Sequence, residues 1–420
     1  MSGGPPPYSA PLFGRRPSAP RNGLGLSALA GGGFAGGAVA SSSSSAPTQH
    51  TFVFDDELQA RLEGSAIKHF PKREKSDNAK FAKENYHLVK QGYYTDVTNQ
   101  QHDLRLPRDA INKIYEAPKT AGRPLSYRHP RTNVCVARID TATAMRTLQQ
   151  TLPMTNKVAA LNFANAYHPG GGYLNGARAQ EEDLCRLMPT LYSSLKRLKY
   201  PMKEPTCFFT QAWLARTAGS YSLDGPPVLV NILSAAMPDL GSWHNKLTAG
   251  DRKWDATVRL RMRAVLHAAR EEKCETIVLG AFGCGAFANP PDMVAKIFAE
   301  VLASDEFRGA FSTVVFAILE FKGSDSGNVA AFVRACGAQP GGLCHQPPTS
   351  QEPPNYGYKT EGPPPQQPPP PPLPPTGGAP PQPPPVASNG SNGGVRPMEI
   401  DDEAVLAFGR QGNGNGFPRE

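Results

Sequence analysis

The sequence predicts an α/β protein in which a mostly parallel or mixed sheet is flanked by helices, with a helical extension before it and disordered tails at both ends. Three observations predict this. Short apolar runs alternate with helical patterns through the middle of the chain. Both ends are rich in Gly, Ser and Pro instead. The 420 residues are still 39% hydrophobic, which is enough for a large core between those ends.

The N-terminal end, residues 1–50, is predicted to be a disordered arm. Runs of Gly, Ser and Pro offer no apolar face that could pack on a core. No acidic residue occurs before Asp55, so an organelle transit peptide is the alternative interpretation. The glycine runs and Pro5–Pro7 favour the flexible arm.

The C-terminal end, residues 341–420, is predicted to be a proline-rich disordered tail. Consecutive prolines such as Pro368–Pro372 favour a solvated polyproline II conformation. This tail is either a spacer without a partner or a ligand for an aromatic-grooved adaptor domain. Met398–Phe408 mixes acidic and apolar residues, so it either folds on a partner or is simply part of the tail.

Residues 51–130 are predicted to be an N-terminal helical part of the catalytic region. Lys80–Lys90 and Arg108–Glu116 are rich in helix formers. Gly92 and Pro118 follow these two segments and are expected to end the helices.

Residues 131–340 are predicted to form the core of the α/β fold. Nearly continuous apolar runs there are typical of strands that are buried on both faces. The predicted strands are Val134–Ile139, Val158–Phe163, Val228–Leu233, Thr276–Phe282 and Val314–Leu319. Apolar stripes at helical spacing lie at 184–195, 258–269 and 293–302, and Pro189 is expected to break the first of them.

The first candidate site segment follows the strand that ends at Phe163. Ligands of such sheets bind beyond the carboxyl ends of the strands. Asn165 and the three glycines Gly170, Gly171 and Gly172 occur here, and glycines let a backbone approach a ligand closely. Gln180-Glu181-Glu182-Asp183 follows at the start of an apolar helix. Acidic residues also favour a first helical turn for dipole reasons alone, which is the alternative explanation.

The second candidate segment follows the strand that ends near Phe282. It contains Gly283, Cys284, Gly285, Ala286 and Phe287 and opens onto a helix. Glycine-rich amides at a helix start can bind phosphate, although a structural tight turn explains the same glycines. One segment with carboxylates and another with anion-binding amides fit a ligand with a central diphosphate and a terminal sugar, as in ADP-ribose.

These segments resemble the signatures of the microbial-type poly(ADP-ribose) glycohydrolases, a family with a macrodomain fold. Gly170-Gly171-Gly172, seven residues and then Gln180-Glu181-Glu182 carry the main resemblance. Gly280–Phe287 resembles the diphosphate loop of the family, and the resemblance extends from about residue 55 to residue 338. It implies a macrodomain-like ADP-ribose-binding core that hydrolyses the ribose–ribose O-glycosidic bond of poly(ADP-ribose), with exo action that releases ADP-ribose.

The resemblance also implies roles for individual residues. Glu182 is the expected general acid and base, and Glu181 and Asn165 are expected to hold the reacting ribose. The backbone of Gly170–Gly172 is expected beside that ribose, and Gln180 is expected to be a scaffold or site-adjacent residue. The expected contacts to the diphosphate and its neighbouring sugar are Gly283, Cys284, Gly285, Ala286 and Phe287. Asp140 and Phe321 are possible adenine contacts, with a helix N-cap and a core position as their alternative interpretations.

Other functions and partners can be weighed on the sequence. The alternatives are a non-catalytic ADP-ribose reader and a hydrolase of mono-ADP-ribosylated protein. The expected partner is poly(ADP-ribose) or an ADP-ribosylated protein, and no metal or other cofactor is expected. No apolar run reaches about 18 residues, so no membrane span is predicted. The net charge of +8 alone does not indicate a nucleic-acid binder, and seven scattered cysteines favour a reducing compartment, the nucleus or cytoplasm.

Overall fold

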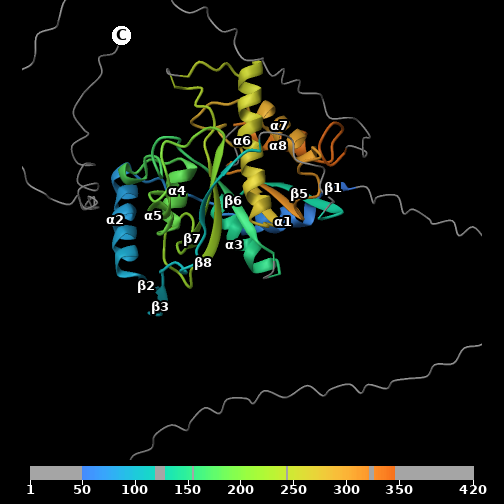
Figure 1. Ribbon diagram of the computed structural model, residues 1–420. Helices are drawn as coiled ribbons and strands as arrows, with labels where there is room; N and C mark the ends of the chain where they lie inside the picture. The colour runs from blue at the N-terminus through green and yellow to red at the C-terminus, as the bar shows by residue number, and fades with distance from the viewer. Residues whose placement is uncertain (1–49, 119–127, 154–155, 243–244, 321–325, 346–420) are drawn as a thin grey trace, which may run out of the picture. The chain divides into compact units, whose positions relative to one another are not determined.

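The computed structural model describes residues 50–118, 128–153, 156–242, 245–320 and 326–345. The predicted arm before residue 50 and the predicted tail after residue 345 lie outside the described residues, as does Phe321. The strands of the described residues are β1 (Thr51–Phe54), β2 (Tyr93–Thr95), β3 (Gln101–Asp103), β4 (Asn112–Glu116), β5 (Arg131–Ala137), β6 (Val158–Phe163), β7 (Thr206–Leu214), β8 (Val228–Ala235), β9 (Thr276–Leu279) and β10 (Thr313–Ala317). Two sheets result, a mixed one of eight strands and a small one made of β2 and β3 (Figure 1).

The strand order of the large sheet is β1-β5-β10-β9-β6-β8-β7-β4. Its first six strands are parallel, and β7 and β4 add to it in antiparallel pairs. β6 and β9 are direct neighbours, with Val158 opposite Thr276. Because parallel strands end at the same edge of a sheet, the segments that follow β6 and β9 emerge side by side.

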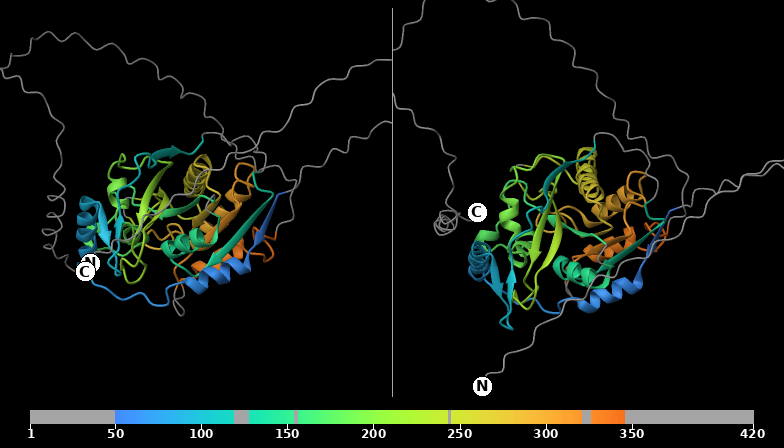
Figure 2. Two further views of the ribbon diagram at one scale, coloured as in Figure 1. Left: turned by 90° about the horizontal axis from the view of Figure 1, so that it is seen from below. Right: turned by 60° about the horizontal axis from the view of Figure 1, so that its bottom comes forward.

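Helices cover both faces of this sheet (Figures 1 and 2). The helices are α1 (Asp56–Ser65), α2 (Lys75–Gln91), α3 (Thr141–Thr151), η1 (Tyr173–Asn175, 3₁₀), α4 (Gln180–Leu187), α5 (Leu191–Leu195), α6 (Arg252–Glu271), α7 (Pro291–Ala303) and α8 (Asn328–Cys336). Val134 and Val136 of β5 point to the core under α6, α7 and α8, whereas Cys135 and Ala137 point to the core under α1, α3 and α4. This alternation is the two-residue period of a strand that is buried on both faces.

The predicted elements of residues 131–340 are present. All five predicted strands form, within a few residues of their predicted bounds. The apolar stripe that contains Pro189 is broken there, because α4 ends at Leu187 and α5 begins at Leu191. None of the helices in the described residues is long and apolar enough to cross a bilayer.

One predicted helix is wrong. Within Arg108–Glu116, residues Asn112–Glu116 form the strand β4, in which Ile114 lies opposite Phe208 of β7. β7 itself was not predicted, and its free edge supplies the hydrogen-bond partners that hold this segment extended. Pairing with a neighbouring strand outweighs a helix propensity of a few tenths of a kcal/mol per residue. The described residues of the range 51–130 therefore contribute two helices and two edge strands of the large sheet, beside β2 and β3.

Candidate active site

Both glycine-rich segments begin at the same edge of the sheet. The ring centroids of Phe163, at the end of β6, and Phe282, just after β9, lie 5.5 Å apart. The strand pairing thus places the start of the Gly170 segment directly beside the start of the Gly283 segment, although 119 residues separate the two phenylalanines in the sequence.

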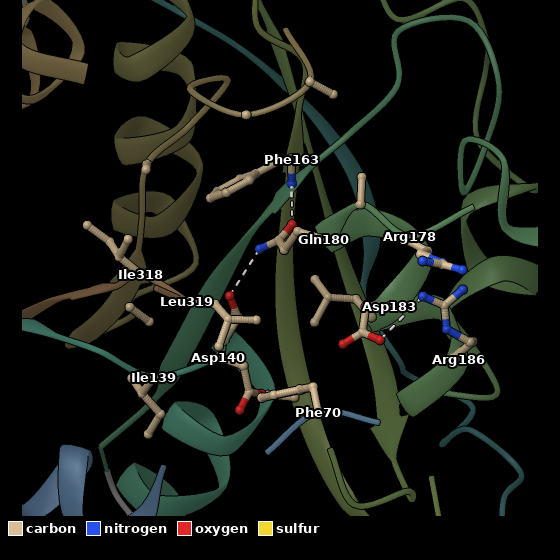
Figure 3. Close-up of a pocket in the computed structure, with 18 of the residues that line it drawn as sticks. Phe70, Ile139, Asp140, Phe163, Arg178, Gln180, Asp183, Arg186, Ile318 and Leu319 are labelled. Atoms are coloured by element: carbon tan, nitrogen blue, oxygen red, sulfur yellow. Dashed lines mark hydrogen bonds and ion pairs between the residues drawn. The ribbon is translucent and has the colours of Figure 1, made fainter. Parts of the chain in front are cut away.

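Gln180 fixes the start of α4 against the end of β6. Its Oε1 accepts the backbone N–H of Phe163 at 2.8 Å (Figure 3). Its Nε2 donates to the backbone oxygen of Leu161 at 2.8 Å. Nε2 also donates to Oγ1 of Thr141 in the first turn of α3, at 3.1 Å. The three bonds set the position of the two glutamates that follow Gln180.

Glu182 has one oriented oxygen and one oxygen without a partner. Its Oε1 accepts the backbone N–H of Gly172 at 2.8 Å. Its Oε2 is buried and has no hydrogen-bond partner among the described residues. The whole residue is only 7% exposed. An unpaired buried oxygen costs about 1–3 kcal/mol, so a native structure that keeps one calls for an explanation.

Glu181 is held more completely. Its Oε2 accepts the backbone N–H of Asn165 at 2.7 Å, and its Oε1 accepts Nδ2 of Asn162 at 3.3 Å. The side chain is 2% exposed, and this burial raises the pKa of Glu181 to about 8. The lost hydration outweighs the hydrogen bonds that the carboxylate accepts, so Glu181 keeps its proton to a higher pH than an exposed glutamate does.

Both carboxylates converge on the backbone of Gly171. Gly171 has a φ of +55°, and an ideal Cβ there would lie 2.5 Å from Oε1 of Glu182 and 3.0 Å from Oε2 of Glu181. A side chain at this position would meet both oxygens as well as an unfavourable backbone angle. The loop can therefore bring its backbone against the two carboxylates only with glycine here.

Asn165 shapes the first loop. Its Oδ1 accepts the backbone N–H groups of Tyr167 and His168, at 2.8 and 3.0 Å, so its side-chain oxygen closes a turn. Any hydrogen bond from the Asn165 side chain to a ligand must therefore be donated by its amide nitrogen.

The raised pKa of Glu181 predicts how the free energy of unfolding depends on pH. On unfolding, the pKa of Glu181 falls from about 8 towards its ordinary value of 4.5. Between pH 4.5 and pH 8, unfolding therefore releases a proton from this carboxyl group. The stabilisation is complete below pH 4.5, decreases as the pH rises through this window and is lost above pH 8, with a total on the order of a few kcal/mol. In Glu181→Gln this decrease should be absent from urea unfolding curves measured between pH 5 and pH 9. Equal slopes for the variant and the wild type would show that Glu181 is ionised in the folded protein.

The second loop is held by Asn289. Nδ2 of Asn289 donates to the backbone oxygens of Gly283 and Pro238, at 3.0 and 2.8 Å, and Oδ1 accepts Nε1 of Trp254 at 2.9 Å. Gly283 has a φ of +73°, and an ideal Cβ there would lie 2.6 Å from the Cβ of Met237. These contacts make the loop a rigid turn in which glycine is required at position 283.

The amides of this loop differ in their partners. The N–H of Cys284 donates to the backbone oxygen of Ala281, so it is already used. The N–H groups of Gly285, Ala286 and Phe287 donate to no acceptor among the described residues. Burial raises the pKa of the Cys284 thiol to about 12, so this residue is not a thiolate nucleophile.

A cavity of about 640 Å³ lies between the start of α4 and the second loop. One side of it is lined by Gln180 and Asp183 of α4, and the other by Gly283 and Gly285–Phe287. Glu181, Glu182, Asn165 and Gly170–Gly172 do not line this cavity. They lie next to it, because successive residues of a helix point about 100° apart and the two glutamates face the Gly171 loop.

The far end of the cavity contains Asp140, which is at the N-cap of α3 (Figure 3). Its Oδ1 accepts the backbone N–H of Thr143 at 2.9 Å, whereas its Oδ2 is buried without a partner among the described residues. Burial raises the pKa of this carboxyl group. The N-cap interpretation of Asp140 is thus confirmed, and the residue also faces the cavity.

The linker between α1 and α2 supplies wall residues that were not predicted from the sequence. Phe70–Arg73, in the linker between α1 and α2, line the cavity consecutively. This linker has no periodic pattern and no motif, so nothing local marks it as part of a site.

Asp183 also differs from its two acidic neighbours, because its Oδ1 accepts from Nη2 of Arg186 and from the hydroxyl of Tyr221. Among the described residues no group of three or more His, Cys, Asp or Glu is placed to hold a metal ion.

Comparisons with known proteins agree on one family. A family model described as the microbial-type poly(ADP-ribose) glycohydrolase (PARG) catalytic domain matches residues 82–211. The structure of the glycohydrolase from Thermomonospora curvata bound to the inhibitor ADP-HPD is 30% identical, with a TM-score of 0.52 over 62% of this chain and 99% of that chain. The enzyme from Deinococcus radiodurans in complex with ADP-ribose is 34% identical, with a TM-score of 0.42 over 48% and 83%. A search of curated protein sequences found no match.

Proposed function

We propose a role for each side chain of the site from one premise: the chain belongs to the microbial-type poly(ADP-ribose) glycohydrolases and is a glycoside hydrolase acting on poly(ADP-ribose). Glu182 is the general acid and base of this reaction. The observation that carries the proposal is its buried Oε2, which has no partner while Oε1 is fixed by Gly172. A carboxylate with one anchored oxygen and one available oxygen is oriented for proton transfer.

The reaction then proceeds in two proton transfers at Oε2. Glu182 gives its proton to the leaving ribose oxygen as the bond from that oxygen to C1″ breaks, with the electron pair going to the oxygen. Positive charge develops on C1″ and its ring oxygen. A water attacks C1″, and the carboxylate of Glu182 takes the proton that the water loses. Oε2 is then protonated again, so one turnover restores the residue.

Glu181 and Asn165 hold the reacting ribose in this proposal. A protonated Glu181 adds no second negative charge beside Glu182. Its carboxyl group can donate a hydrogen bond to one ribose hydroxyl and accept a hydrogen bond from another. The amide nitrogen of Asn165 is the group of its side chain that can donate to the same sugar, because Oδ1 closes the turn. Holding the sugar by several groups fixes C1″ against Glu182.

The second loop binds the diphosphate. The N–H groups of Gly285, Ala286 and Phe287 are its donors, and a rigid loop at the start of a helix favours an anion. The ring of Phe287 packs against the adjoining sugar. The N–H of Cys284 is excluded from this set because Ala281 accepts it.

The adenosine occupies the far end of the 640 Å³ cavity, where Oδ2 of Asp140 is the available acceptor for the exocyclic amine of adenine. The four consecutive wall residues Phe70–Arg73 support exo action, since they restrict the room for a polymer that continues past the adenosine. The enzyme then binds a terminal unit and releases it as ADP-ribose.

Product analysis tests the exo action. Automodified poly(ADP-ribose) is digested briefly, and the products are separated by length. We expect ADP-ribose as the first soluble product, with polymers that shorten progressively. Short oligomers of several units, released at early times before ADP-ribose accumulates, would contradict exo action without affecting the assignment of Glu182.

A further inference from the structure

A second cavity, of about 280 Å³, lies between α2, η1 and α5. Its walls include the rings of Tyr86, Tyr173 and Tyr192. Tyr173 and Tyr192 have their ring centroids 5.4 Å apart. Nothing in the proposed mechanism uses this cavity.

The second cavity is also cationic. Lys90 of α2 and Lys196, just after α5, line it, and their Nζ atoms lie 5.9 and 5.8 Å from the ring centroids of Tyr86 and Tyr192. No Asp or Glu belongs to its lining among the described residues. The polar amide of Asn85 at its wall is fully engaged, because Nδ2 donates to the hydroxyl of Tyr173 and Oδ1 accepts from Arg216.

Tyr192, a wall residue of this cavity, packs against the loop that contains Gly170, Gly171 and Gly172. An ideal Cβ on Gly170 would lie 2.9 Å from Cδ2 of Tyr192, so the tyrosine ring packs on the loop backbone. The N–H of Tyr173 donates to the backbone oxygen of Gly170 at 3.0 Å. The next residue, Gly171, lies against the carboxylates of Glu182 and Glu181.

We propose that the second cavity binds a nucleotide unit of poly(ADP-ribose) on the leaving-group side of the bond that is cleaved. The inference rests on the proposed function, because it assumes that the terminal unit fills the 640 Å³ cavity and that C1″ lies at Glu182. The polymer beyond C1″ must then continue away from that cavity. Tyrosine faces stack on adenine and ammonium groups pair with phosphates, which matches a polyanion that carries a base in every unit.

The second cavity would add to the affinity of the enzyme for the polymer. Stacking of one base on an aromatic side chain is worth about 1–3 kcal/mol, which corresponds to about fivefold or more in affinity. A unit held behind Gly170 would also hold the leaving ribose near the loop that carries Gly171 and Gly172. The second cavity is therefore expected to increase affinity for polymer and to leave the chemistry on a small leaving group unchanged.

The test compares two substrates and two variants. The substrates are long poly(ADP-ribose) and a reporter in which an aryl alcohol is the only group attached to C1″ of ADP-ribose. The double variant Lys90→Ala/Lys196→Ala should increase KM for the polymer about tenfold, with kcat/KM for the reporter unchanged. The control is Lys83→Ala on α2, because Lys83 is exposed and lines neither cavity.

The outcomes separate this inference from the proposed function. An unchanged KM for polymer in the double variant overturns the second site, and so does an equal loss in Lys83→Ala. An equal loss on the reporter also overturns it, because that result shows a general structural effect. Cleavage of the reporter by the wild type but not by Glu182→Gln supports the proposed function in each of these cases.

Discussion

Replacing Glu182 by Gln should reduce turnover of poly(ADP-ribose) by about a hundred- to ten-thousand-fold, the usual contribution of a general acid and base. Gln is close to isosteric, and its side-chain oxygen can still accept the N–H of Gly172 that Oε1 accepts in the wild type. The loop should therefore keep its conformation while the proton transfer at Oε2 is lost. Initial rates of ADP-ribose release from automodified polymer measure this effect.

Binding separates a catalytic role of Glu182 from a structural one. The cavity that holds the nucleotide does not include Glu182, so the affinity of Glu182→Gln for ADP-ribose, measured by calorimetry, should stay within about threefold of the wild type. Glu57→Gln is the matched control, because Glu57 is an exposed glutamate at the start of α1 and should turn over normally. A Glu182→Gln variant with near-normal turnover would assign the proton transfer to another group, with Glu181 as the next carboxyl group.

The core of the fold could be predicted from the sequence, and the edges of the sheet could not. Strands such as β6 and β10 are buried on both faces, so they show as continuous apolar runs whatever their neighbours are. The strand β4 has an exposed Ile114 and polar residues on either side, and it is a strand only because β7 offers an edge. Whether such a segment becomes a strand depends on the strand that it pairs with and not on its own residues.

The candidate site was predictable as far as it depends on strand ends. Parallel neighbours such as β6 and β9 bring their following loops together, so two glycine-rich segments could be assigned to one site. Only the family resemblance assigned different roles to Glu181 and Glu182. Their different hydrogen bonds could not be predicted, because the backbone N–H groups of Asn165 and Gly172 decide which oxygens are paired. The linker wall at Phe70–Arg73 depends on tertiary packing alone.

The strongest effect expected from a change outside the carboxylates is that of Gly171→Ala. The added Cβ would lie 2.5 Å from Oε1 of Glu182, closer than real Cβ contacts allow, and 3.0 Å from Oε2 of Glu181, which is a tight contact. Since the carboxylate of Glu182 must move and that of Glu181 must give by a few tenths of an ångström, we expect turnover to decrease about a hundredfold or more. Strain at a φ of +55° should add about 1–3 kcal/mol of destabilisation, which thermal unfolding measures.

Gly341→Ala separates the effect of contact with the carboxylates from the effect of backbone strain. Gly341 has a φ of +85°, and an ideal Cβ there meets no atom within 4 Å, so its replacement brings backbone strain without a collision. We expect Gly341→Ala to lower the melting temperature and to keep normal turnover, whereas Gly171→Ala should lose both. If Gly171→Ala retained turnover within about threefold of Gly341→Ala, the two carboxylates would not need to meet at the glycine backbone. The glycine at this position would then serve only the turn, and the catalytic geometry would have to be set by the hydrogen bonds of Asn165 and Gly172 alone.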